Sequence, residues 1–279
     1  MSIQTELTRI TNAKAAIKTA IEGKGVTVPS DTLLDGMASL IESIEAGGGA
    51  TEPYIEEVID GNGDITNATL HGHTIIRNNA FYNCTNLALV SLPSGLTSIG
   101  NNAFNNCTKL ALTRLPSGVT SIGDDAFYNC TNLVLTSLPS GVTSIGNSAF
   151  HSCSSLALTS LPSGITSIGN YTFYNCTKLA LTSLPSGITS IGICAFYGCS
   201  SLALTRLPSG ITSIGNFAFQ NCSSLASLTF EGKPESISKS AFKECTNLTT
   251  INVPWAPGAV ANAPWGAINA TINYNFPGA

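Results

Sequence analysis

Residues 110–130 read LALTRLPSGVTSIGDDAFYNC, and close copies of this stretch recur along most of the 279-residue chain. Each copy carries a cysteine with a phenylalanine three residues before it, and the copies follow one another every 23 residues. A fixed period of roughly 20 to 50 residues is typical of solenoids, in which each unit buries its apolar face against its neighbours. The cysteines are Cys84, Cys107, Cys130, Cys153, Cys176, Cys199, Cys222 and Cys245, and the phenylalanines are Phe81, Phe104, Phe127, Phe150, Phe173, Phe196, Phe219 and Phe242.

The repeat sets the expected division of the chain. Counting from Ile76, eight units of 23 residues reach Ala259, and we predict a β-rich solenoid of about eight coils with a small helical module before it. The predicted parts are a helical module (1–46), a Gly-rich linker (47–52), an N-terminal cap (53–75), the solenoid (76–259) and a C-terminal cap (260–279).

One unit predicts its own local structure. Residues 110–116 read as a strand closed by a proline, and residues 119–123 as a second extended piece after a Ser-Gly turn. Cap-type residues then precede Ala126 and Cys130, whose spacing predicts a single helical turn. In the N-terminal cap, the residues DGNGD at 60–64 predict a tight turn between two strands.

The order of leucine and threonine in the first strand of the unit leaves two interpretations of which leucines are buried. If Leu115 points inward, the alternation of a strand sends Thr113 inward and Leu112 outward. This interpretation exposes a column of six leucines, an apolar surface large enough to mark a binding site. The alternative is a bulge that turns Leu110 and Leu112 inward together. The six leucines are Leu89, Leu112, Leu135, Leu158, Leu181 and Leu204.

The periodic cysteines predict a column of buried thiols rather than disulfides. Equivalent side chains of stacked coils point alike, which gives a poor disulfide torsion, and free cysteine is among the most buried residue types. Disulfides or a metal site are the alternative, although no metal-ligand spacing such as CxxC appears. A ninth cysteine, Cys194, lies outside the column, and we expect it to be exposed.

The first 46 residues predict two amphipathic helices. Apolar residues spaced by fours and threes form a seam of the coiled-coil kind, and a partner helix is expected because such short helices are marginal alone. We expect this seam to pair between subunits, in a trimer, while a self-contained helical hairpin is the alternative. The seam residues are Ile3, Leu7, Ile10, Ile17 and Ile21.

Composition excludes several classes of function. Charged residues make up only 10% of the chain, its net charge is −4, and no run of Lys or Arg occurs, so nucleic-acid binding is not expected. No apolar stretch is long enough to span a membrane, and the N-terminus lacks the features of a signal peptide. With three histidines and no catalytic motif, we expect neither an enzyme nor a cofactor or metal.

Two positions of the repeat vary while their neighbours barely change. They lie two residues before and one residue after each phenylalanine. They are rich in Tyr, Asn, Ser and His, a composition that resembles that of antibody binding sites. Selected diversification and drift at unconstrained surface sites both explain this variation. Aromatic and arginine side chains usually dominate binding energy. The predicted ligand-binding residues are Tyr128, His151, Tyr174 and Tyr197 on the turn, and Arg114 and Arg206 on the strand.

Three motifs recur across residues 76–255: Leu-x-x-apolar-x-Leu-Pro, Val/Ile-Thr-Ser-Ile-Gly and Ala-Phe-x-x-Cys. They resemble the BspA-like leucine-rich repeats. This resemblance implies a right-handed β-solenoid used for adhesion and protein binding, with no catalytic residues to carry over.

A second resemblance covers the first 49 residues, with AKAAIK at 13–18 and KGVTVP at 24–29. They are similar to N-terminal segments of tail-associated proteins from phages and prophages of Gram-positive bacteria. The two resemblances together favour a virion protein of a phage tail that recognises a surface protein or glycan of a bacterial host and contacts other tail proteins. A bacterial cell-surface adhesin and an intracellular interaction scaffold are the alternatives.

Overall fold

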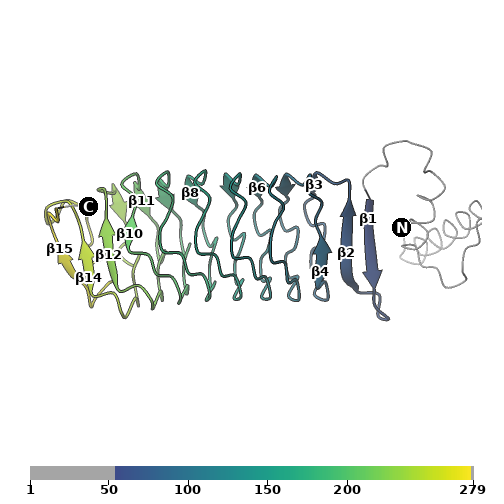
Figure 1. The fold of residues 1–279 in the computed structure, drawn as a ribbon. Coiled ribbons are helices and arrows are strands. Elements are labelled where there is room, and N and C mark those ends of the chain that lie inside the picture. The colour runs from purple at the N-terminus through teal and green to yellow at the C-terminus, as the bar shows by residue number, and fades with distance from the viewer. Residues whose placement is uncertain (1–53, 278–279) are drawn as a thin grey trace, which may run out of the picture.

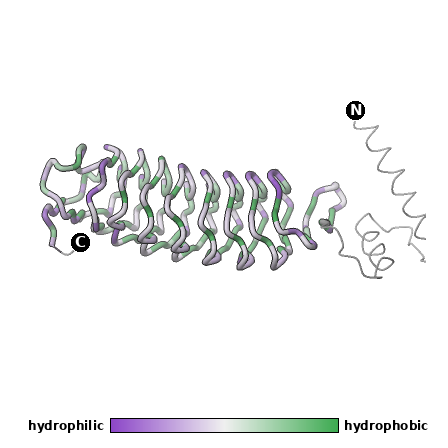
Figure 2. The backbone as a smooth tube through the Cα atoms, turned by 90° about the horizontal axis from the view of Figure 1, so that it is seen from above, coloured by the Kyte–Doolittle hydropathy of each residue, from purple (hydrophilic) through white to green (hydrophobic). Residues whose placement is uncertain are grey.

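The computed structural model describes residues 54–277, which form a rod of about nine stacked turns (Figure 1). The predicted leucine-rich solenoid is therefore confirmed. We number the coils 1 to 8 by their phenylalanines, from Phe81 to Phe242. Figure 2 shows hydrophobic and hydrophilic stretches recurring in successive coils, as the 23-residue period requires.

An antiparallel hairpin begins the rod. Strands β1 (Tyr54–Ile59) and β2 (Ile65–His71) pair with each other. Across the turn between them, the Asp60 amide donates a hydrogen bond to the Asp64 carbonyl at 2.9 Å. The predicted turn at 60–64 is thus confirmed. Strand β2 also pairs in parallel with β4 (Leu89–Ser91), which joins the hairpin to coil 1.

Short parallel strands line two sides of the rod. On one side, two-residue strands of successive coils, Ser-Ile in all but β3, pair in two groups of four, with an interruption between β7 and β8. These strands are β3 (Ile75–Ile76), β5 (Ser98–Ile99), β6 (Ser121–Ile122), β7 (Ser144–Ile145), β8 (Ser167–Ile168), β9 (Ser190–Ile191), β11 (Ser213–Ile214) and β13 (Ser236–Ile237). On the other side, the second sheet contains β10 (Arg206–Leu207), β12 (Ser227–Phe230), β14 (Thr250–Asn252) and β15 (Thr271–Asn273).

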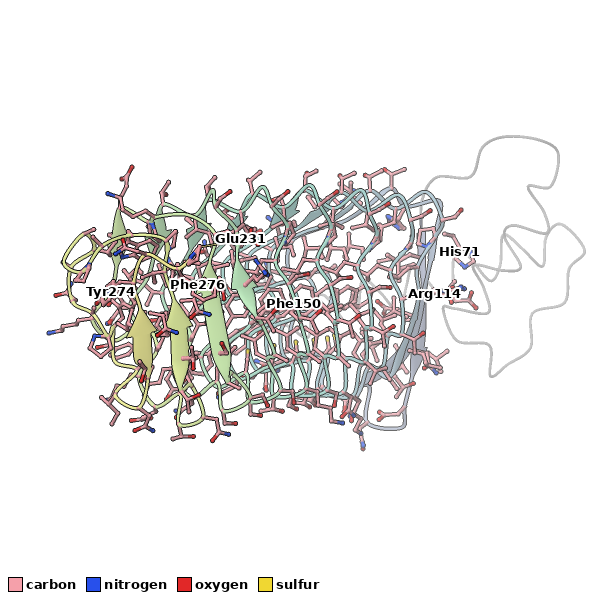
Figure 3. All side chains as sticks on the ribbon, turned by 60° about the vertical axis from the view of Figure 1, so that its left-hand side comes forward. His71, Arg114, Phe150, Glu231, Tyr274 and Phe276 are labelled. Atoms are coloured by element: carbon pink, nitrogen blue, oxygen red, sulfur yellow. The ribbon has the colours of Figure 1, made fainter. Side chains whose placement is uncertain are left out.

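The phenylalanines stack along the inside of the rod. All eight are fully buried, and the ring centroids of neighbouring coils lie 5.1–5.6 Å apart, with nearly parallel planes. Figure 3 places Phe150 within this interior. Beyond Phe242, the buried Trp265 lies 23 residues further along the chain, and the Phe242 amide donates to the Trp265 carbonyl at 2.9 Å. Trp265 and Trp255 both pack against Phe230 and so close the C-terminal end of the core.

The expected helical turn is wrong, and successive β-turns take its place. In coil 3, Asp125 and Asn129 both have positive φ angles, 52° and 55°, which interrupt any right-handed helix. The amides of Tyr128 and Cys130 donate to carbonyls three residues back, whereas the amide of Phe127 donates to Ala149 of the next coil at 2.8 Å. Local turns and bonds between coils therefore alternate along this segment.

The leucine column is buried in coils 2 to 6, so the exposed column is wrong there, and Leu110 and Leu112 both point inward as the alternative required. Leu135, Leu158 and Leu181 are fully buried, and the neighbouring threonines are exposed. In the segment 110–116, the first, third and sixth residues point inward, so the fourth and fifth both point outward. The alternation that regular strand pairing needs is therefore lost. The predicted strand at 110–116 is accordingly absent from coils 2 to 5. Only Leu89, in coil 1, is exposed, at 61%.

The buried and the exposed positions of this column predict very different effects of the same substitution. Leu158→Lys places an ammonium group in the core and should lower the free energy of unfolding by more than about 3 kcal/mol. Leu89→Lys, at the equivalent exposed site, should change it by less than about 0.5 kcal/mol. Urea denaturation of both variants measures this difference, and equal effects would contradict the assigned burial.

The cysteines of the column are free thiols, and seven of the eight are buried as predicted, with Cys84 of coil 1 as the exception. In coils 2 to 8, each Sγ donates to the carbonyl oxygen of the phenylalanine 26 residues earlier, at 2.9–3.1 Å. Burial raises the pKa of these thiols, that of Cys107 to about 12. The expectation for Cys194 is wrong: its side chain is 7% exposed, because its position in the turn folds it against the rod. Cys84 of coil 1 is the half-buried cysteine instead.

Thiol accessibility tests this arrangement. Brief alkylation of the native protein should label Cys84 first, because the other eight cysteines are buried. Burial and the nearby Glu57 and Asp64 raise the pKa of Cys84 as well, so its labelling should be slow and should accelerate with rising pH. Mass spectrometry should find all nine thiols labelled after denaturation. Labelling of Cys194 before Cys84 would contradict the structure.

The predicted N-terminal parts lie outside the described residues. This holds for the helical module, the Gly-rich linker and the oligomerisation seam Ile3, Leu7, Ile10, Ile17 and Ile21. Within residues 54–277 no α-helix is present, and hence none that is long and apolar enough to cross a membrane.

Candidate binding surface

The turn side of the rod consists of residues 124–131 of coil 3 and their equivalents in the other coils. Two residues of each turn have left-handed backbone, with φ between 52° and 70° in most coils. Asparagine fills many of these positions because it tolerates this conformation better than other non-glycine residues. The repeated turn geometry fixes which side chains point out of the rod.

Four predicted ligand-binding residues form one continuous stack on this side. Tyr128, His151, Tyr174 and Tyr197 follow the buried phenylalanines of coils 3 to 6, and we call them the aromatic column. Their ring centroids are 4.4, 4.5 and 4.6 Å apart in succession, and the planes of neighbouring rings differ by 14° or less. The structure thus brings together residues that are 23 positions apart in sequence.

Stacking determines which atoms of the aromatic column can meet a ligand. Each inner ring is covered on both faces by its neighbours, which leaves the ring edges for contact, and the Tyr197 hydroxyl accepts a hydrogen bond from Asn221 Nδ2 at 3.5 Å. At the two ends of the column the equivalent residues are Asn105 and Gln220, both buried. The column therefore offers a narrow strip of edges and hydroxyls instead of open aromatic faces.

His151 lies in the middle of this stack. Its Nδ1 is 3.0 Å from the Ser152 hydroxyl oxygen, and burial lowers the pKa of its imidazole below the ordinary value of 6.5. Burial also raises the pKa of Tyr174, with further contributions from Tyr197 and Cys194. Both shifts favour the neutral forms of these two residues.

The predicted arginines do not join the aromatic column. Arg206 belongs to β10, on another side of the coil, and pairs with Glu231 at 3.4 Å. Arg114 lines a hollow of about 660 Å³ between coils 1 and 2, beside the exposed Leu89. Figure 3 shows Arg114 toward the N-terminal end of the rod and Glu231 in its other half. The six predicted residues therefore form one cluster of four and two separate positions.

Sequence reasoning missed three residues that flank the aromatic column. Tyr171 and Ile193 are exposed at 40% and 43%, and the Tyr171 ring lies 6.0 Å from that of Tyr174. Phe217 is half-buried in the next coil. Tyr171 and Phe217 belong to the variable position two residues before each phenylalanine, so their departure from asparagine was a signal available in the sequence.

Potential metal ligands do not gather in the part of the chain that the structure describes. No group of three or more His, Cys, Asp or Glu side chains there could hold an ion. His71, in the motif His71-Gly72-His73, instead approaches Glu56, with 3.4 Å between Nε2 and Oε2.

Comparison with known proteins identifies the repeat. Residues 74–181 and 166–258 match the BspA type leucine rich repeat region, which is two thirds of the chain. The chain belongs to this family. No curated protein shows significant similarity to it.

Two solved structures are similar to this chain, and the first has the same fold. A leucine rich cell surface protein from Faecalibacterium prausnitzii is 25% identical, with a TM-score of 0.53 over 74% of this chain and 71% of that one. A leucine rich repeat protein from T. pallidum is 29% identical, with a TM-score of 0.48 over 62% of this chain and 88% of that one.

The environment of His151 predicts a pH effect. The folded state disfavours the imidazolium, so below about pH 6.5 the unfolded chain takes up the proton first and folding loses stability. The control is His151→Gln, which introduces the residue that coil 7 has at this position. When the pH falls from 7 to 5, the free energy of unfolding of the wild type should decrease more than that of this variant. Chemical denaturation at both pH values measures the difference, and a difference independent of pH would contradict this environment.

Proposed function

We propose that the chain is a non-catalytic recognition protein of a bacterial cell surface, and that it binds a protein or glycan through the turn side of its solenoid. The observation that carries this proposal is the aromatic column, a continuous row of partly buried ring edges and hydroxyls across four coils. Aromatic side chains that lose little conformational entropy on binding are effective anchors.

The surface location is supported by the chain's relatives. The BspA-type repeats cover most of the described rod, and the similar protein from F. prausnitzii is described as a leucine rich cell surface protein. This favours the adhesin alternative over the phage-tail role. The tail hypothesis depends on residues 1–49, which lie outside the described residues, and no similar protein reported above is described as a tail protein.

Protease treatment of intact cells tests the location. In the organism that encodes the chain, external protease should remove the full-length protein from intact cells while a cytoplasmic marker survives. Full protection of the chain until lysis would contradict the surface location. Its recovery in purified phage particles would support the tail role instead.

Paired substitutions test the binding side. Tyr174→Ala with Tyr197→Ala should reduce binding of the labelled full chain to a panel of intact bacterial cells by at least about tenfold, as expected for loss of aromatic anchors. The matched control is Thr159→Ala with Thr182→Ala, exposed residues on another side of neighbouring coils. Flow cytometry measures both. If the control loses binding and the tyrosine variant does not, the turn side is the wrong surface.

A further inference from the structure

Three consecutive coils carry apolar side chains where the other coils mostly carry polar ones. Tyr171 of coil 5, Ile193 of coil 6 and Phe217 of coil 7 lie on the turn side, and we call them the apolar patch. The Tyr171 amide donates to the Ile193 carbonyl at 2.8 Å, so Tyr171 and Ile193 are direct neighbours across coils, and Phe217 occupies in coil 7 the position that Tyr171 has in coil 5. The apolar patch also adjoins the aromatic column through Tyr171 and Tyr174.

The backbone conformation at two of these positions does not suit the residues that occupy it. Tyr171 and Phe217 both have φ of 57°, in the left-handed region. Coils 1 and 2 have Asn79 and Asn102 at the equivalent positions, with φ of 59° and 54°, and asparagine tolerates this region well. A bulky side chain there is strained, and such strain persists where function requires it.

Ile193 breaks a second pattern of the repeat. In most coils the residue three before the phenylalanine uses its side-chain oxygen to accept a hydrogen bond from the next coil. Asn101 Oδ1 accepts from the Asp124 amide at 2.9 Å, and Asn170 Oδ1 accepts from the Ile193 amide at 2.8 Å. Isoleucine has no acceptor to offer to the following amide, that of Asn216. The chain thus replaces a hydrogen-bonding residue with an apolar one that is 43% exposed.

The turn side is uncharged in coils 4 to 7, and the charged residues of coil 8 (Lys239, Lys243 and Glu244) border the apolar patch beyond Phe217. Between Asp125 of coil 3 and Lys239 of coil 8, the outward positions of the turn side contain no Asp, Glu, Lys or Arg. Aromatic enrichment with depletion of charge is the composition of the centre of a protein–protein interface. Stacking against sugar rings, in contrast, needs open aromatic faces, which the aromatic column covers.

We propose that Tyr171, Ile193 and Phe217 are the anchor residues for a protein partner whose contact surface is apolar and uncharged at its centre. This inference rests on the proposed recognition function and names its partner class. It explains why one region gives up both a favourable backbone residue and a hydrogen bond between coils.

The proposal predicts that one variant gains stability and loses binding. Tyr171→Asn with Ile193→Asn restores the residues that coil 2 has at these positions, Asn102 and Asn101. The variant should melt at a higher temperature than the wild type, because strain is relieved and the Asn216 amide gains an acceptor. A change that merely removed packing would lower the melting temperature instead.

The binding probe is a phage-displayed library of random 12-residue peptides, panned on the full chain. The wild type should enrich peptides rich in aromatic and aliphatic residues, and the variant should bind them at least tenfold more weakly. Ser148→Asn, in the same variable column of coil 4, is the matched control and should leave their affinity unchanged.

Four results would overturn the proposal: unchanged peptide affinity in the variant, a lower melting temperature of the variant, enrichment of mainly charged peptides, or no enrichment from the library. A glycan array run in parallel identifies a carbohydrate site if the library gives nothing. The test is independent of the protease assay, since the peptides can bind the apolar patch whether or not the chain is at the cell surface.

Discussion

The stacking of equivalent side chains between adjacent coils is the interaction on which the structure depends. A single 23-residue coil has no enclosed core, and its phenylalanine and leucines become buried only when the next coil covers them. The eight phenylalanines are all fully buried, with ring centroids 5.1–5.6 Å apart. Stability in such a rod is a sum over coils and their nearest-neighbour contacts.

This dependence explains why some positions of the repeat hardly vary. The cysteine side chain is small enough for the interior, and its Sγ–H donates to a phenylalanine carbonyl of the previous coil. At the glycine that follows most of the Ser-Ile pairs, the coils approach closely: a Cβ on Gly123 would lie 2.7 Å from the Asn101 nitrogen. The outward turn positions have no such constraint from the core, so diversity can accumulate there, and the aromatic column and the apolar patch occupy these positions.

Much of the architecture could be predicted from the sequence, because the period fixes which residues stack. The solenoid, the thiol column and the convergence of Tyr128, His151, Tyr174 and Tyr197 follow from the 23-residue spacing, and the turn at 60–64 follows from its own residues, DGNGD. Local backbone conformation could not be predicted as well. The spacing of Ala126 and Cys130 suits a helical turn, but only the structure shows that Asp125 and Asn129 adopt left-handed conformations.

The errors have a common physical cause. Strand alternation left the burial of Leu112 open, because the choice depends on how neighbouring coils fill the core. Cys194 is buried for a similar reason, since its orientation follows from the turn and not from its distance to the cysteine column. The arginines share a column in sequence, yet Arg206 has Glu231 as a partner whereas Arg114 borders a hollow.

The free energy of unfolding of Phe150→Ala tests most directly whether coil-to-coil stacking holds the rod together. Phe150 is fully buried between the rings of Phe127 and Phe173. The account predicts a loss of about 3–5 kcal/mol relative to the wild type, while Tyr82→Ala at an exposed turn position should change little. A loss of less than about 1 kcal/mol for Phe150→Ala would contradict a core built on this stack.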